Sequence, residues 1–403
     1  MLFLFSGRLL STLGNYTFDF AIAWYILRNG GTSLQSSIVL MSALLPQVIL
    51  GPFAGVIVDR IPRKKILVSM DFIRAAIITL VGCLMYFKLL PFWLLCFLLF
   101  LAGICSSLYS PACNSLIPDI VEKEEINKAN SIDSLASNIS RILGPLLGGA
   151  FYTYFGMTII VYVDGISFLL SAMLELFIVV KYEEITQIET DASVIEDLVE
   201  GYRYIKGRPG LYLLLWFYVA INFLSVPIIQ IYFPYTYNNI LKTSTAQLTM
   251  TNFTFGLGFV IGAIISSVLP QKEKYHNRIC RSFLVSCCMV LGFSIPLFPF
   301  IFVKLSVNSI VFFYSVLAVI CGTFMMLGNI PLFVIFQRDV DDSVRGRVFA
   351  LMNTFTNAAT PLGYLVAGWL VGFVPMYMLI FVIGIIVVML NIMLMFSKSI
   401  VEL

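Results

Sequence analysis

The sequence predicts an all-α integral membrane protein with twelve transmembrane helices in two pseudo-symmetric bundles of six. Three observations predict this fold class: the composition, the spacing of the apolar runs and the placement of the positive charges. Of the 403 residues, 60% are hydrophobic and only 12% are charged. Soluble proteins carry about 25% charged residues, so this chain has too few to surround a soluble domain, and most of its surface must face lipid.

The apolar runs are long enough for twelve crossings, since a helix needs about 20 mostly apolar residues to span the hydrocarbon core. The predicted spans lie at residues 2–28, 35–58, 66–87, 91–113, 129–154, 158–181, 210–236, 247–270, 282–303, 309–336, 348–373 and 375–397. The longest polar segment separates the sixth span from the seventh. We therefore predict an amino-terminal six-helix bundle at 1–181, a cytoplasmic linker at 182–209 and a carboxy-terminal six-helix bundle at 210–403.

The predicted linker has a helical pattern in its second half. Apolar residues recur there at helical spacing, with charged residues between them: Val194, Leu198, Tyr202 and Ile205. This pattern predicts an amphipathic helix that lies along the inner membrane surface.

The positive charges orient the chain. Of its 25 Lys and Arg residues, 18 fall in loops that the twelve-span prediction places in the cytoplasm, and 4 fall in loops that it places outside. Cytoplasmic loops of membrane proteins carry an excess of Lys and Arg. We therefore predict a multi-pass protein of the cell membrane with both termini in the cytoplasm.

The two halves carry traces of an internal repeat. A shift of 219 positions places Gly103 on Gly322, Lys128 on Arg347 and Gly144 on Gly363. Duplicated six-helix units are common in secondary transporters, whose substrate site lies between the repeats near the middle of the membrane.

Two motifs resemble those of a known family. The stretch Gly55–Lys65 (GVIVDRIPRKK) resembles the loop signature G-x-x-x-D-R-x-G-R-[RK] of the major facilitator superfamily, with Pro62 where Gly is usual. Residues 144–149 (GPLLGG) resemble that superfamily's antiporter motif, G-P-x-x-G-G. Segments 110–130, 200–202 and 345–349 resemble its macrolide-efflux and enterobactin-exporter branch. The resemblance covers essentially the whole chain, and it implies the major facilitator fold and an exporter.

The basic loop is predicted to be a conformational latch, formed by Gly55, Asp59, Arg60, Arg63 and Lys64. Glycine permits close helix approach, and loop cations can contact Asp119, Glu122 or the carboxyl ends of helices. Such a charge cluster can hold one conformation and break in the other. The alternative is a solvated loop that only sets the topology.

The antiporter motif comprises Gly144, Pro145, Gly148 and Gly149. Its glycines predict a flat helix face for tight packing, and its proline permits a bend. Its implication of export rests on the family resemblance alone.

Ionisable residues inside the membrane are expensive and mark functional sites. The first span carries Arg8, Thr12, Asn15 and Asp19 on one helical face, which we expect to face a cavity. The proton-coupling candidates are Asp19, Arg141, Glu175 and Arg8. We expect Asp19 and Arg141 either to pair or to compete for the same proton and substrate. The alternative is a purely structural ion pair.

Asp164 is expected near water at the outer end of the sixth span. Asp71 and Arg74 are expected to form a local structural pair. Drug–proton antiporters of the superfamily often carry an Arg in the fourth helix, and this fourth span has no charge.

The predicted substrate cavity is lined by amide, aromatic and thioether side chains: Asn15, Tyr218, Asn222, Gln230, Asn252, Met325 and Asn329. Such a mixture suits an apolar, loosely specified ligand. The alternative for each of them is a place in the ordinary core.

These observations favour a non-enzymatic exporter of a small amphipathic molecule, drug- or macrolide-like, driven by proton antiport with rocker-switch alternating access. Its predicted partners are the substrate, protons and the lipid bilayer, with no nucleic acid, cofactor or metal, and it is predicted to work as a monomer. The eight Cys residues form no C-x-x-C pair, and the single His276 is expected to be solvated. An exporter of a siderophore, peptide or lipid-like metabolite is the alternative. A polytopic membrane enzyme and a non-transporting receptor are less favoured.

Overall fold

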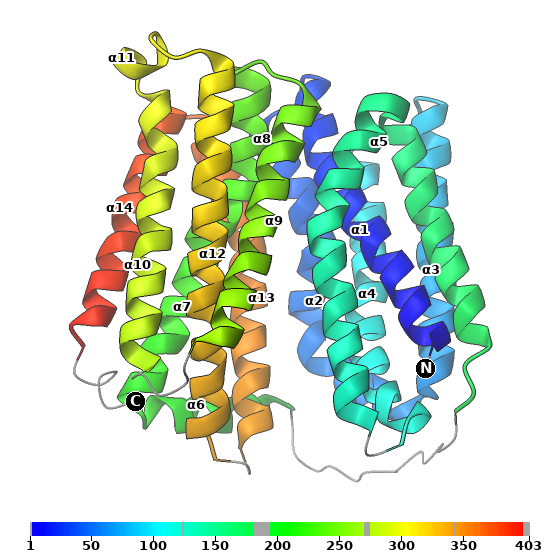
Figure 1. The fold of residues 1–403 in the computed structure, drawn as a ribbon. Coiled ribbons are helices and arrows are strands. Elements are labelled where there is room, and N and C mark those ends of the chain that lie inside the picture. Colours follow the sequence, from blue (N-terminus) through cyan, green and yellow to red (C-terminus); the bar gives the residue numbers. More distant parts are fainter. Residues whose placement is uncertain (1, 123–124, 181–193, 270–274, 342–343, 398–403) are drawn as a thin grey trace. The chain divides into compact units, whose positions relative to one another are not determined.

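The structure is a computed structural model that describes residues 2–122, 125–180, 194–269, 275–341 and 344–397 (Figure 1). All regular structure in these ranges is helical. The chain divides into two compact units. The first contains the helices α1 (Leu2–Arg28), α2 (Ser33–Arg60), α3 (Arg63–Tyr86), α4 (Phe92–Ile120) and α5 (Ile126–Leu176).

The second unit begins with α6 (Val194–Lys206). The helices that follow are α7 (Pro209–Pro227), α8 (Phe233–Tyr235), α9 (Thr245–Val268), α10 (Tyr275–Ser294), α11 (Pro299–Phe302), α12 (Val307–Asp339), α13 (Arg345–Leu370) and α14 (Met376–Met395). Two π-helical turns, Ile228–Tyr232 and Thr236–Ile240, flank α8 and continue the path of α7. The predicted boundaries of the two bundles and the linker remain predictions, and residues 182–193 of that linker lie outside the described residues.

Helix α5 contains two crossings. It is 51 residues long, and Gly156 interrupts its helical dihedral angles with φ of 77°. This left-handed conformation is readily adopted only by glycine, and it reverses the helix at the top of the view in Figure 1. The predicted break between residues 154 and 158 is confirmed.

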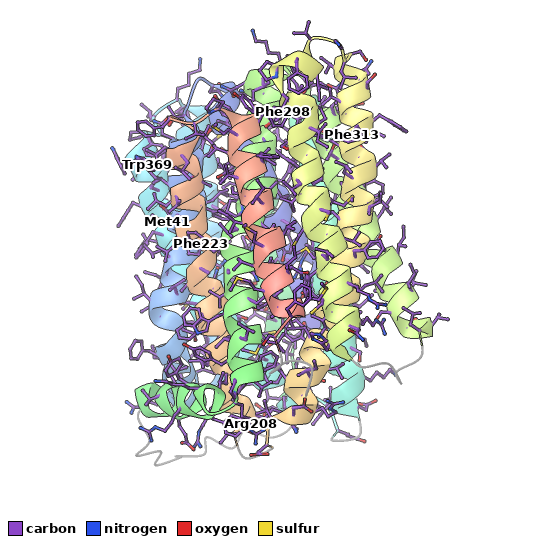
Figure 2. All side chains as sticks on the ribbon, turned by 90° about the vertical axis from the view of Figure 1, so that its left-hand side faces the viewer. Met41, Arg208, Phe223, Phe298, Phe313 and Trp369 are labelled. Atoms are coloured by element: carbon purple, nitrogen blue, oxygen red, sulfur yellow. The ribbon has the colours of Figure 1, made fainter. Side chains whose placement is uncertain are left out.

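The count of twelve crossings follows from this reversal. Nine helical segments in the described ranges are long and apolar enough to cross a membrane, and one of them, Lys128–Leu176, holds both crossings of α5. Helices α1 and α13, with 27 and 26 residues, complete the twelve. Trp369 and Phe313 project outward and are exposed, as expected for side chains that face lipid (Figure 2).

The internal repeat is visible in the packing of each unit. A Cβ atom at Gly103 would overlap the carbonyl oxygen of Ala43 in α2, and one at Gly322 would overlap that of Phe255 in α9. Gly144 likewise packs on Tyr16 of α1, and Gly363 on Phe223 of α7. Glycines 219 positions apart therefore make equivalent close helix contacts in the two halves.

Two boundary predictions are wrong, since α4 continues to Ile120 instead of ending at residue 113, and the ninth span starts earlier than predicted. Helix α10 begins at Tyr275 instead of residue 282, and it includes His276. His276 is only 5% exposed and lies 3.6 Å from the sulfur of Cys280, so it is not the solvated loop residue that was expected. The helical turn continues because Ile279, Cys280 and Phe283 bury one face of this segment.

Candidate functional site

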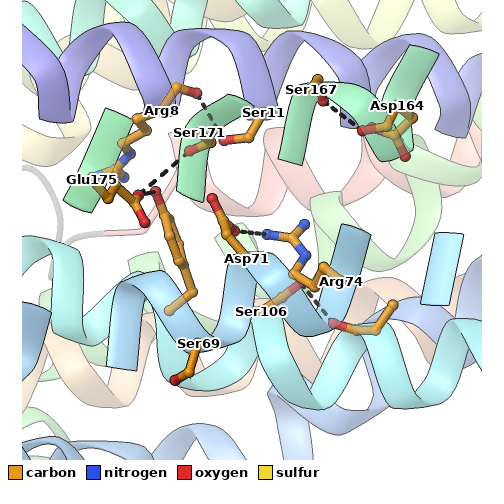
Figure 3. A network of polar contacts seen from close by, with 12 residues as sticks. Arg8, Ser11, Ser69, Asp71, Arg74, Ser106, Asp164, Ser167, Ser171 and Glu175 are labelled. Atoms are coloured by element: carbon orange, nitrogen blue, oxygen red, sulfur yellow. Dashed lines mark hydrogen bonds and ion pairs between the residues drawn. The ribbon is translucent and has the colours of Figure 1, made fainter. Parts of the chain in front are cut away.

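The first unit holds a cluster of buried polar side chains between α1, α3, α4 and α5 (Figure 3). Four charged residues in it are nearly inaccessible to solvent: Asp71, Arg74, Asp164 and Glu175. Burying charged groups is costly unless they are paired or neutralised by protons. The cluster contains more carboxyl groups than cations, so it is suited to binding protons.

Arg74 is the cation of this cluster. Its Nη1 lies 3.5 Å from Oδ1 of Asp71, one helical turn earlier in α3. Its guanidinium carbon lies 3.8 Å from the ring centroid of Phe168 in α5, a cation–π contact. The predicted local pair with Asp71 is confirmed. However, the charge of Arg74 also acts on Asp19 and Asp164, and this wider role was missed because it depends on how α3 packs against α1 and α5.

A small cavity of about 70 Å³ lies beside Arg74. Its polar lining comes from all five helices of the first unit: Asn15, Asp19, Gln47, Arg74, Ser106 and Asp164. Asp19 is half-buried and reaches the cavity from α1. Asn15 and Asp19, four residues apart on the predicted polar face, therefore line the same cavity.

Asp164 is the most enclosed acid of the cavity. It is 1% exposed, and neither of its carboxyl oxygens has a hydrogen-bond partner among the described residues. The expectation that it lies near water is wrong. It follows the reversal at Gly156 by two helical turns, and α1 covers it closely. A Cβ atom at Gly14 of α1 would lie 2.6 Å from Oδ1 of Asp164.

Arg8 does not reach the cavity, although it shares a helical face with Asn15 and Asp19. Its Nη1 lies 2.9 Å from Oδ1 of Asp133 in α5 and donates to Oδ1 of Asn114 in α4 at 3.3 Å. Arg8 therefore binds three helices together near one end of the unit. Asp133 was missed although the sequence carried its signal, an acidic residue inside the predicted fifth span.

The predicted pairing of Asp19 with Arg141 is wrong. Arg141 is exposed and forms no ion pair among the described residues, whereas the cation that acts on Asp19 is Arg74. The physical reason is the rotation of the helices. Gly144 and Gly148 of α5, and not Arg141, form the face that packs against Tyr16 and Thr17 of α1.

This packing explains two residues of the antiporter motif. A Cβ atom at Gly148 would lie 2.7 Å from the carbonyl oxygen of Thr17, and one at Gly144 would overlap the side chain of Tyr16. The predicted flat helix face is confirmed at these two glycines. Gly149 is buried and Pro145 is half-buried in the same helix.

Glu175 lies at the other end of the cluster and is fully buried. Its Oε1 accepts a hydrogen bond from the hydroxyl of Tyr109 at 2.7 Å and one from Ser171 at 3.4 Å. Its Oε2 has no hydrogen-bond partner within the described part of the chain. Figure 3 shows Glu175 and Asp164 at opposite ends of the cluster.

The basic loop makes two of the contacts that the sequence predicts. Nη1 of Arg63 lies 2.6 Å from Oδ2 of Asp119 in α4 and donates to the carbonyl oxygen of Ser115 at 3.0 Å. Nζ of Lys64 donates to the carbonyl oxygens of Leu176 and Ile178, at 2.8 Å each. The predictions that loop cations contact Asp119 and a helix carboxyl end are confirmed.

The predicted latch also includes Arg60, Asp59 and Gly55. Arg60 is exposed, and the side chain of Asp59 lies outside the part that the structure describes. Nothing lies within 4 Å of a Cβ atom built at Gly55. Within the first unit, Gly55 therefore makes no close helix contact, contrary to the expectation.

The cavity candidates of the second unit are half-buried: Tyr218, Asn222, Gln230, Asn252, Met325 and Asn329. The ring of Tyr218 packs on Phe333 at a centroid distance of 5.9 Å. The amide nitrogens of Asn222 and Asn252 donate to carbonyl oxygens of their own helices at 2.8 and 3.0 Å. Oδ1 of Asn329 is buried without a hydrogen-bond partner among the described residues, and of this set it is the atom most in need of a ligand.

A second polar cluster joins α6 to α13 and was missed. Oε2 of Glu200 lies 2.8 Å from Nη1 of Arg347, and Nη2 of Arg208 lies 3.2 Å from Oδ2 of Asp341. The amide of Asp341 donates to the hydroxyl of Tyr204 at 3.0 Å. Partial burial raises the pKa of this hydroxyl above its ordinary value. The predicted amphipathic helix thus packs against α13 through the ion pair of Glu200 with Arg347, besides burying Ile205. Arg208 and Asp341 pair just beyond the ends of α6 and α12.

No group of three His, Cys, Asp or Glu residues that could hold a metal ion occurs in the described ranges.

Comparison with known proteins identifies relatives along almost the whole chain. The profile of the Major Facilitator Superfamily matches residues 4–363. Macrolide efflux protein A of Streptococcus pyogenes is 23% identical over 366 residues, which cover 90% of this chain and 87% of that protein. The staphyloferrin A transporter of Staphylococcus aureus is 24% identical over 373 residues, covering 90% and 87%. A solved bacterial homologue of the iron transporter ferroportin has a TM-score of 0.74 at 17% identity and covers 98% of both chains.

Proposed function

The chain belongs to the Major Facilitator Superfamily, and we propose that it exports a small amphipathic, drug- or macrolide-like molecule across the cell membrane in exchange for protons. The two six-helix halves alternate access by a rocker-switch movement, and both termini lie in the cytoplasm. The protein is a multi-pass transporter, and nothing in its family points to an enzyme. We further propose that it works as a monomer without a cofactor.

The observation that carries the proton coupling is the cavity beside Arg74. Asp19 and Asp164 line it, and Asp71 lies 3.5 Å from the same guanidinium group. Three carboxyl groups around one cation cannot all be ionised in a buried site without a large electrostatic cost. Binding and release of a proton at Asp19 or Asp164 keeps the charge of the site balanced during transport.

Asp19 is the proton carrier in this proposal. It is half-buried and lies at the wall of the cavity, whereas Asp164 is enclosed behind α1. A carrier must contact water in at least one conformation, and Asp19 is the acid best placed to do so. Arg74 supplies from α3 the cation that the superfamily's drug–proton antiporters often carry in the fourth helix.

The cavity is too small for the transported molecule. A volume of about 70 Å³ is well below the several hundred Å³ of drug-sized pockets. The larger binding surface is assigned to the aromatic, Met and amide side chains of the second unit, with Asn329 as its hydrogen-bonding residue. Asn15 lines the small cavity of the first unit.

Asp19→Asn tests the proposal. In proteoliposomes loaded with a macrolide or a cationic dye, we expect the variant to lose the acceleration of transport that an imposed proton gradient produces in the parent. Glu125→Gln, which neutralises an exposed carboxylate of the same unit, is the matched control and should transport normally. Unchanged gradient-driven transport by Asp19→Asn contradicts the assignment.

Siderophore export is the second candidate, and the staphyloferrin A transporter among the relatives supports it. A siderophore carries several carboxylate or catecholate groups, whereas the side chains assigned to the binding surface of the second unit, among them Asn222, Gln230 and Asn329, carry no positive charge to attract them. A panel of labelled macrolides, dyes and siderophores in a pump-deficient host separates the two candidates.

A further inference from the structure

We propose that the carboxyl end of α5 is a proton-operated clasp. Glu175 holds a proton while Lys64 binds the carbonyl groups of Leu176 and Ile178. When Lys64 releases these carbonyl groups, Glu175 gives its proton to water. The inference rests on the proposed proton-coupled transport and adds a second proton site, which is linked to the basic loop.

The clasp consists of one cation and two backbone oxygens. Helix α5 ends at Leu176, and the last carbonyl groups of a helix have no partner within it. Nζ of Lys64 donates to the carbonyl oxygen of Leu176, the last residue of the helix, and to that of Ile178 just beyond it, at 2.8 Å each. Its positive charge also interacts favourably with the negative end of the helix dipole. Glu175 immediately precedes the first of these carbonyl groups, so the acid and the clasp share one helical turn.

Every helix packed around Glu175 contributes charged or titratable groups, and among the described residues no cation forms an ion pair with Glu175, although the charge of Arg74 acts on it. Helix α1 supplies Arg8, which is paired with Asp133 at 2.9 Å. Helix α3 supplies Arg74, which lies 3.5 Å from Asp71. Helix α4 supplies Tyr109 and Cys113, and only the hydroxyl of Tyr109 bonds to Glu175. In α5 itself, the remaining partner is Ser171.

The proton is therefore placed on Oε2 of Glu175. Oε1 accepts the two hydrogen bonds from Tyr109 and Ser171, and Oε2 has no partner among the described residues. An ionised carboxylate in this fully buried position would have no ion-pair partner, and burying an unpaired charge is costly. When water reaches Oε2, the O–H bond breaks, the proton passes to a water molecule, and the carboxylate keeps both hydrogen bonds at Oε1.

Opening of the clasp is what admits water. Ile178, held by Lys64, is buried in an apolar cluster with Leu116 and Ile120 of α4. Release of Lys64 frees this end of α5 to leave the cluster and to uncover the carboxyl group of Glu175. If ionisation favours the open clasp, an open clasp must favour ionisation to the same extent. Lys64 is thus a positioning residue, and Glu175 is the group that binds the proton.

The test measures the clasp directly, in the full chain reconstituted in lipid nanodiscs. Spin labels are placed by Lys65→Cys and Val179→Cys, both exposed positions that flank the clasp. The two native cysteines that are not buried, Cys83 and Cys288, are replaced by Ser. Double electron–electron resonance then gives the populations of short and long label distances between pH 5 and pH 9.

In the parent, we expect the long-distance population to rise with pH. Glu175→Gln, which cannot ionise and still accepts from Tyr109, should keep the short distance at every pH. Lys64→Gln should show the long distance at every pH, and Lys64→Arg should restore the parent response. A parent without pH response, or Glu175→Gln with the parent's response, overturns the proposal.

Two further variants keep the test decisive. Tyr109→Phe removes the hydrogen bond that stabilises the ionised carboxylate, and it should move the midpoint of the pH response to higher pH by about one unit or more. An unchanged midpoint in this variant also contradicts the clasp, even if Glu175→Gln does not fold. Asp19→Asn should retain the clasp's pH response while losing gradient-driven transport, so the clasp and the proposed function can fail independently.

Discussion

Gly14 of α1 leaves the space that the carboxyl group of Asp164 in α5 occupies. A Cβ atom at this position would lie 2.6 Å from Oδ1 of Asp164 and would overlap the hydroxyl of Ser167. The close approach of α1 is what seals Asp164 from solvent. One hydrogen atom in place of a methyl group thus permits an acid to be buried beside the cavity.

Gly14→Ala should therefore lower both stability and transport. Overpacking a tight helix contact costs about 1–3 kcal/mol, and displacing Asp164 changes the charge arrangement around Arg74. We expect a lower melting temperature in detergent and a several-fold slower proton-driven transport. Gly51→Ala is the matched control, since nothing lies within 4 Å of its Cβ position. Equal behaviour of the two variants would show that the contact at Gly14 is not tight.

Arg74→Gln should destabilise the first unit. Removing one partner of a buried ion pair costs about 3–5 kcal/mol, and Asp71 would be left without its cation. The double variant Asp71→Asn/Arg74→Gln should recover most of the melting temperature, because it removes both charges. It should still transport at least about tenfold more slowly, because Asp19 and Asp164 also lose their cation. Full transport by the double variant would show that Arg74 stabilises the fold but has no part in transport.

Arg74→Lys should restore only part of the activity. A lysine keeps the charge, but it cannot present a flat guanidinium group to the ring of Phe168, which lies 3.8 Å from the guanidinium carbon. We expect a transport rate between those of the parent and Arg74→Gln, measured under the same proton gradient. A rate equal to that of the parent would mean that the ring contact has no influence on transport.

Asp119→Asn should slow the transport cycle with little loss of stability. The side chains of Arg63 and Asp119 are 30% and 18% exposed, and a partly exposed ion pair is worth about 1 kcal/mol or less. The pair is expected to act in switching, so the charge-reversed variant Arg63→Asp/Asp119→Arg should recover part of the lost rate. Stopped-flow transport measures the rate, and thermal melting provides the control. No difference in rate between parent and Asp119→Asn would favour the solvated-loop alternative.

Gly201→Ala tests the contact of α6 with α13. Its Cβ atom would lie 3.0 Å from the carbonyl oxygen of Arg347, a backbone atom that cannot move aside by itself. We expect a lower melting temperature and slower transport. Gly207→Ala, one and a half turns later, would meet its nearest atoms at 3.5 Å or more and should behave like the parent. Equal melting temperatures for the two variants would contradict the tight contact.

Cysteine labelling tests the orientation. In whole cells, with Cys83 and Cys288 replaced by Ser, a membrane-impermeant maleimide should label Lys88→Cys and spare Lys65→Cys. Permeabilised cells should label both, because both positions are exposed. The reverse pattern would place the basic loop outside the cell and overturn the predicted topology.

The helices themselves were predictable because burial in lipid imposes a simple rule on the sequence. Each crossing requires about 20 apolar residues, and the break between residues 154 and 158 coincides with the positive φ of Gly156. The start of α10 was misplaced because charged residues such as Arg278 and Arg281 suggested a loop. The helix tolerates them near its end, where long side chains can reach the polar interface.

The contacts of the basic loop were also predictable in kind. Excess cations beside helix ends find carboxylates and free carbonyl groups, and Arg63 and Lys64 do so. The partners inside the membrane were not. Arg141 appeared to be the natural cation for Asp19, yet the structure gives that place to Arg74 and pairs Arg8 with Asp133.

The sequence by itself determined the number of crossings, their division into two related halves, and which spans carry charge. Only the tertiary structure decided which of these charged groups form ion pairs and which carboxyl groups have no partner among the described residues. It also decided that Lys64 binds the carbonyl groups of Leu176 and Ile178, next to Glu175. The reason is physical: apolar length and composition are properties of each helix alone, whereas contacts between side chains depend on the rotation and crossing of neighbouring helices. In this chain, α1 and α5 approach each other closely at glycines such as Gly14, Gly144 and Gly148, and this close packing fixes which polar faces meet.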